Sequence, residues 1–99
     1  MFVMREVLRC KPGKVGELKK KFQALNAVVK RRDLPGFTIM TDVAGDHFWT
    51  LVLQFEADSP EAFFAMEEQV MADAEARQVM AGYHDLVLSG SRELFRKET

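Results

Sequence analysis

The most restrictive feature of the sequence is a change of hydrophobic period at Lys11–Lys14 (KPGK). Before it, residues 2–11 are dense in aliphatic and β-branched side chains, which is typical of a strand. After it, apolar residues recur at three- and four-residue steps (Val15, Leu18, Phe22, Leu25 and Val29), which predicts an amphipathic helix. Pro12 ends strand pairing and Gly13 lets the chain turn, so the chain begins as a strand followed by a helix.

This helix is expected to end before Asp33–Phe37 (DLPGF), because Pro35 disfavours the helical conformation at the residue before it. Residues 37–43 and 47–56 then read as the two arms of a β-hairpin, with Gly45 in its turn. In the second arm, alternation assigns one face to His47, Trp49, Leu51, Leu53 and Phe55. This face is the more apolar, and we expect it to lie against the helices.

A second helix is predicted to begin with Ser59 as its N-cap and Pro60 in the first helical position. A new helix is expected to restart with Asp73 as its cap, to keep helical steps as far as Val87, and to end at Gly90. Residues 91–97 form the last predicted strand.

The predicted order is strand, helix, strand, strand, helix, strand, within one domain that spans residues 1–99. In a chain of this length the order favours the α+β class, with a four-stranded antiparallel sheet that carries its helices on one face. Right-handed crossovers place the first and third strands in the centre of that sheet.

The other face of the sheet is predicted to be open, and to be half apolar and half polar. Its expected members are Val3, Arg5, Val7, Arg9, Phe48, Thr50, Val52 and Gln54. Such a face in a small domain commonly pairs with a second copy, so a homodimer through the open sheet face is expected. Arg5 and Arg9 would form ion pairs there, with Glu56, Glu93 or Asp42 as acceptors, or would bind an anion.

Composition and charge exclude several classes of function. The net charge is −1, and the basic segment 14–32 lacks interleaved exposed aromatic residues, so binding to nucleic acid is not expected. The acidic segment 58–76 is its complement, which predicts two helices side by side. No apolar run approaches a membrane span, and no Cys/His cluster has the spacing of metal ligands. Cys10 is alone, which fits a reducing cytoplasm.

Two pairs of residues are the candidates for chemistry. His47 and Trp49 share a strand face and could both reach a space between sheet and helices; alternatively, His47 lies at the solvated end of the hairpin while Trp49 caps the core. Tyr83 belongs to the inner helical stripe, as a core aromatic or as a donor to a ligand, whereas His84 is expected to be exposed.

The segments VLRCKPGKVGEL, TDVAGDHFWTLVLQFE and SGSRELFR resemble those of the NIPSNAP-like proteins. These belong to the dimeric α/β-barrel superfamily, which includes the antibiotic-biosynthesis-monooxygenase-like domains. The resemblance implies a ferredoxin-like βαββαβ subunit that dimerises through its sheets. It carries over no catalytic residue, because the matching segments are turns and strand ends.

The sequence thus predicts a homodimer that binds a small, largely apolar molecule between sheet and helices, without a cofactor. Its expected walls are Trp49, Tyr83, Phe22 and Met66, and Arg5 and Arg9 are further candidates for ligand binding. If the protein is an enzyme, the resemblance points to a cofactor-free oxygenase or an isomerase, with His47 as the base and Tyr83 or Trp49 as the donor to an oxyanion. The alternative is a structural or regulatory dimerisation module without ligand or catalysis.

Overall fold

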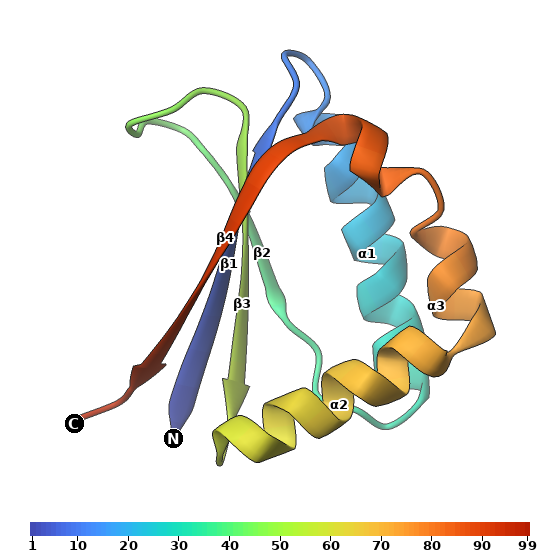
Figure 1. Ribbon diagram of the computed structural model, residues 1–99, viewed down its shortest axis with the longest axis vertical. Coiled ribbons are helices and arrows are strands. Elements are labelled where there is room, and N and C mark those ends of the chain that lie inside the picture. Colours follow the sequence, from blue (N-terminus) through green and yellow to red (C-terminus); the bar gives the residue numbers. More distant parts are fainter.

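The computed structural model describes residues 1–99 and consists of one sheet with helices along it (Figure 1). Its strands are β1 (Phe2–Cys10), β2 (Thr38–Thr41), β3 (Thr50–Ala57) and β4 (Val87–Arg96). Its helices are α1 (Val15–Arg31), α2 (Pro60–Ala72) and α3 (Ala74–Val79), followed by a short 3₁₀ turn, η1 (Tyr83–Leu86).

The four strands form an antiparallel sheet in the order β2-β3-β1-β4. The first and third strands are central, as predicted, and α1, α2 and α3 all lie on the same side of the sheet (Figure 1). This is the α+β, ferredoxin-like arrangement expected from the order of the elements. The connection from β1 to β2 carries α1, and the connection from β3 to β4 carries α2 and α3, on that same side of the sheet.

The core lies between α1 and the helix-facing side of the central strands. Leu18 and Phe22 from α1 pack with Leu51 and Leu53 from β3, and the four side chains are between 0% and 6% exposed. Cys10, at the end of β1, belongs to the same cluster and is 2% exposed. The apolar face that the helical period predicts for α1 therefore packs against the apolar face that the alternation predicts for β3.

The predicted helix caps are present. The Ser59 side chain accepts a hydrogen bond from the backbone N–H of Ala62 at 3.1 Å, and Asp73 accepts one from Ala76 at 3.0 Å. The backbone of Asp73 is extended, so the chain leaves α2 there and starts α3, as the sequence predicted.

The basic end of α1 pairs with the acidic start of α3. Arg31 Nη2 lies 2.6 Å from Glu75 Oε2, and Arg32 Nε lies 2.8 Å from Asp73 Oδ2. Because these side chains are partly exposed, each pair stabilises the contact by less than about 1 kcal/mol. The uneven charge along the sequence thus joins two helices.

The predicted end of the last helix was wrong. Helix α3 ends at Val79, and Gly82, with a φ of 80°, turns the chain into η1. Strand β4 begins at Val87, four residues earlier than expected, and Gly90 lies inside it opposite Leu8. Pairing with β1 outweighs the helical spacing of these residues, since ladder hydrogen bonds to a central strand are available from Val87 onward.

No helix is long and apolar enough to cross a membrane.

Candidate functional site

A cleft of about 740 Å³ lies between the helix-facing side of the sheet and the three helices. Hydrophobic residues make up 15 of the 21 that line it. Strands β1 and β3 form its floor through alternate residues, such as Leu8, Leu53 and Phe55, because side chains that are two positions apart share a face. The volume and the apolar lining fall within the range seen for small-molecule sites.

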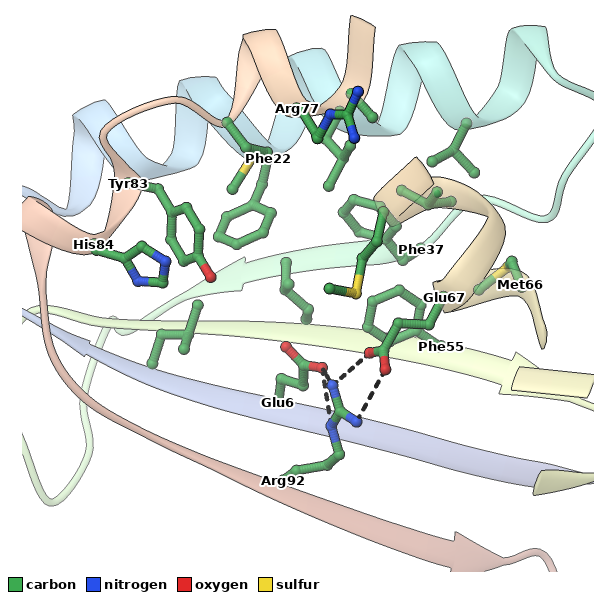
Figure 2. A pocket seen from close by; sticks show the side chains of 18 of the residues that line it. Glu6, Phe22, Phe37, Phe55, Met66, Glu67, Arg77, Tyr83, His84 and Arg92 are labelled. Atoms are coloured by element: carbon green, nitrogen blue, oxygen red, sulfur yellow. Dashed lines mark hydrogen bonds and ion pairs between the residues drawn. The ribbon is translucent and has the colours of Figure 1, made fainter. Parts of the chain in front are cut away.

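A row of aromatic rings runs along the cleft (Figure 2). Tyr83 contacts Phe22 edge-on with ring centroids 6.5 Å apart, and Phe22 contacts Phe37 at 6.4 Å. Phe55 continues the row at 5.0 Å from Phe37, and Phe63 ends it at 5.2 Å from Phe55. Three of these four contacts are edge-on and that between Phe37 and Phe55 is tilted by 43°; such contacts hold each ring in place, so the row gives the cleft a fixed apolar wall.

One ion-pair cluster crosses the sheet side of this cleft (Figure 2). Arg92 on β4 bridges Glu6 on β1 and Glu67 on α2, with Arg92 Nη2 at 2.5 Å from each carboxylate. The Arg92 guanidinium also lies 5.5 Å from the centre of the Phe63 ring. The cluster therefore ties α2, the least buried helix, to the sheet.

Two opposing effects set the pKa of Arg92. Burial lowers it, but hydrogen bonds to Glu67 and Glu6 and the charges of both carboxylates outweigh burial, so the pKa lies above its ordinary value. Arg92 is thus a permanent cation and not a proton donor. Glu6 and Glu67 together carry one negative charge more than Arg92 neutralises.

Tyr83 and His84 form a polar corner at one end of the cleft. Their rings lie against each other with centroids 4.0 Å apart and planes tilted by 33°, and the Tyr83 hydroxyl points into the cleft in Figure 2. Both residues come from η1, where the left-handed Gly82 turns the chain back toward the sheet. Neither side chain has a hydrogen-bond partner within the chain.

Three of the walls expected from the sequence border the cleft, namely Phe22, Met66 and Tyr83. The expected placement of His47 and Trp49 on the strand face toward the helices was wrong, and both lie instead in the exposed loop at the end of the hairpin. Strand β3 begins at Thr50, so both residues belong to the loop before it, and Trp49 has a φ of 61° that breaks the alternation. Neither lines the cleft.

Hydrogen bonds fix the conformation of the loop that precedes β3. Asp42 closes the hairpin, since its Oδ1 accepts from the backbone N–H of Thr50 at 2.8 Å and its own N–H donates to the Thr50 carbonyl. The Trp49 carbonyl accepts from Cys10 at 2.8 Å, beside an irregularity in the pairing of β1 with β4. Alternation cannot extend through residues whose backbone bends in this way.

Arg5 and Arg9 lie on the open face of the sheet, away from the cleft. Arg5 donates to Gln54 at 3.1 Å, and none of the expected carboxylates forms an ion pair with either arginine. Arg9 instead borders a smaller depression of about 290 Å³ together with His47 and Asp42. The sequence candidates are thus divided between two faces of the sheet.

Sequence reasoning missed the cluster of Glu6, Glu67 and Arg92. A signal was present, because alternation in β1 places Glu6 between Met4 and Leu8 on the side that faces the helices. A charged residue there needs a partner. No local pattern indicates which of the arginines supplies it.

Cys10 is buried, and burial followed by the charge of Asp42 raises the pKa of its thiol. The thiol is therefore poorly suited to act as a nucleophile. No group of three His, Cys, Asp or Glu side chains is arranged to hold a metal ion.

The fold belongs to the ferredoxin-like α+β class, and solved structures with this fold superpose on the chain along almost its whole length. An uncharacterized NIPSNAP domain protein from Burkholderia xenovorans superposes with a TM-score of 0.82 at 17% identity, over 98% of this chain and 94% of that one. A NIPSNAP family protein from Agrobacterium tumefaciens gives 0.82 at 12% identity, over 96% and 90%.

A third structure, an antibiotic biosynthesis monooxygenase, gives a TM-score of 0.74 at 12% identity and covers 100% of both chains. No protein-family profile matches the sequence, and no curated protein is significantly similar to it. The resemblance noted in the sequence is thus confirmed at the level of the fold shared with NIPSNAP and antibiotic-biosynthesis-monooxygenase-like proteins. At these identities, the fold by itself does not carry a function.

Proposed function

We propose that this protein binds a small, largely apolar molecule in the cleft between the sheet and the helices. The observation that carries the proposal is an apolar cleft of about 740 Å³ with a fixed row of aromatic rings and a few polar groups at defined positions. A filled core of a purely structural module would leave no such space.

The affinity expected for a generic ligand is modest. A neutral compound of about 15–20 non-hydrogen atoms, at roughly 0.3 kcal/mol per atom, binds with about 5 kcal/mol, or a Kd of order 0.1 mM. A cognate ligand that also satisfies the polar groups of the cleft binds more tightly.

The test uses N-phenyl-1-naphthylamine, a neutral dye whose fluorescence rises in apolar surroundings. We expect saturable binding that Met66→Trp weakens, because the larger ring fills part of the cleft beside α2. Phe64→Trp is the matched control, since Phe64 lies on the same helix, is 48% exposed and does not line the cleft.

Equal affinity in both variants would place the dye elsewhere and would favour the alternative, a dimerisation module without a ligand. Unfolding curves of the two variants, measured in parallel, show whether lost binding reflects the cleft or a loss of folded protein.

Catalysis is a second candidate, favoured by the Tyr83 hydroxyl at the cleft. A cofactor-free oxygenase or isomerase acting on an activated carbon acid needs a donor for the developing oxyanion, and Tyr83 fits that role. His47 does not fit the role of base in this cleft, because it lies at the other side of the sheet. Tyr83→Phe would abolish turnover while binding of a neutral ligand is retained.

The proposed assembly is a homodimer through the open face of the sheet. This face carries Val3, Val7 and Val52 at its centre, and Met40 and Phe95 are 39% and 47% exposed at its edges. A two-fold dimer would cover these residues in both subunits. The unpaired Cys10 supports the proposed location in a reducing cytoplasm.

Sedimentation equilibrium tests the dimer. Val7→Lys places a charge at the centre of the open face and is expected to shift the protein to monomer, whereas Ala27→Lys on the exposed side of α1 leaves the mass unchanged. A wild-type protein that sediments as a monomer at micromolar concentration would overturn this part of the proposal.

A further inference from the structure

The polar groups of the cleft fall into two sets with different hydrogen-bonding states. On the sheet side, Arg92 donates hydrogen bonds to Glu6 and to Glu67. Tyr83, His84 and Arg77 lie on the opposite wall, formed by α3 and η1, and have no side-chain partner within the chain. This second set can donate hydrogen bonds, and Arg77 adds a positive charge.

We propose that the ligand of this cleft is an amphipathic acid, whose carboxylate lies against Tyr83 and His84 and whose apolar body lies along the aromatic row. This inference rests on the proposed function, because it specifies the chemistry of the ligand bound in the same cleft. It follows from these donors, which have no partner within the chain and are open to water, because a purely apolar ligand would cover them without replacing the water they lose.

The charges of the two walls set the orientation of such a ligand. The ion-pair cluster of Glu6, Glu67 and Arg92 holds two carboxylates against one guanidinium, so its side of the low-dielectric cleft repels an acidic group. The wall of α3 and η1 holds Arg77 and the hydrogen-bond donors of Tyr83 and His84, so it attracts that group. The acid is therefore directed to the corner of Tyr83 and His84, which Figure 2 shows above the ion-pair cluster.

The rings fix the rest of the ligand. Tyr83 is continuous with Phe22 through an edge contact at 6.5 Å, so a body attached to a carboxylate at Tyr83 enters the aromatic row directly. A flat or branched apolar group is favoured there, because aromatic rings line this part of the cleft.

The experiment compares 2-naphthoate with 2-acetylnaphthalene, which has nearly the same shape but a methyl group in place of one carboxylate oxygen. Each is titrated into ¹⁵N-labelled protein at pH 7 and followed by NMR, which reports both the affinity and the residues affected. A charged hydrogen bond at a partly exposed corner corresponds to about a tenfold preference for the acid.

Tyr83→Phe and His84→Gln are expected to reduce this preference while they retain binding of 2-acetylnaphthalene. His47→Gln is the matched control, because it alters the only other histidine, which lies outside the cleft. Retained binding of the neutral compound also shows that each variant is folded.

Equal affinities of the two compounds for the wild-type protein would overturn the proposed acid and leave the proposed function intact. Failure of both to bind the cleft would overturn the proposed function as well. A preference for the acid that His47→Gln removes, and that Tyr83→Phe and His84→Gln leave unchanged, would place the anion on the open face and would also overturn the inference.

Discussion

The contact between Asn26 and Phe37 offers a sharp test of how the fold is held together. Asn26 Nδ2 donates to the Phe37 carbonyl at 2.9 Å, and Asn26 Oδ1 accepts from the Phe37 N–H at 3.0 Å. One side chain of α1 thus satisfies both backbone groups of a residue that is 9% exposed and precedes β2. Gly36 permits this approach, because a Cβ there would lie 2.7 Å from Asn26 Oδ1.

We expect Asn26→Ala to lower the free energy of unfolding by about 2–3 kcal/mol. Each of the two hydrogen bonds contributes about 1 kcal/mol net, and the backbone groups left unpaired cost at most about 1 kcal/mol more, because the contact is only partly buried. For a domain of this size, about 4–8 °C per kcal/mol predicts a fall in Tm of roughly 10–20 °C.

Urea unfolding at one fixed protein concentration measures this change, which keeps any effect of dimerisation constant. Gln23→Ala, on the exposed side of the same helix, is the control and should stay within about 0.5 kcal/mol of the wild type. Asn26→Asp should be no better than Asn26→Ala, since it sets a carboxylate oxygen against the Phe37 carbonyl. If Asn26→Ala unfolds at the wild-type midpoint, the double hydrogen bond does not stabilise this protein.

Three further outcomes follow from the structure. Leu51→Ala, at a side chain that is 0% exposed, should cost about 2–5 kcal/mol in urea unfolding; a loss below 1 kcal/mol would contradict the described core. The Cys10 thiol, whose pKa burial raises, should react with a disulfide reagent at pH 8 far more slowly in native protein than in 6 M urea; equal rates would contradict its burial. The Ala76 N–H and Arg32 lower the pKa of Asp73 in the folded protein. The ionised carboxylate therefore stabilises the fold above about pH 4, and this stabilisation is lost as the pH falls through the lowered pKa of the folded state. Asp73→Ala should lower Tm at pH 7 more than at pH 2, and an equal loss at both would refute this.

Residues that act through their neighbours in sequence could be assigned without the structure. Ser59 and Asp73 cap helices because a side-chain oxygen reaches backbone N–H groups three residues on. The helical period of α1 and the alternation of Leu51, Leu53 and Phe55 also predicted their buried faces. These interactions need no knowledge of distant parts of the chain.

The same local reasoning failed where a distant strand competes. Residues from Val87 have helical spacing, yet they pair with β1. In the sequence, His47 and Trp49 continue the alternation of β3. In the structure, the hairpin closes at Asp42 and Thr50, and the bend before Thr50 removes both residues from the strand face. Hydrogen-bond pairing across the sheet decides such boundaries, and periodicity does not encode it.

The sequence by itself determined the order of the elements, the two central strands and the presence of one apolar and one mixed face, because period, capping and turn chemistry are local properties. Only the tertiary structure decided the site. The cluster of Glu6, Glu67 and Arg92 joins residues up to 86 positions apart, and the corner of Tyr83 and His84 exists because Gly82 turns the chain toward β1. Such groups meet only when distant strands pair into the sheet, and this pairing leaves no periodic signal in the sequence.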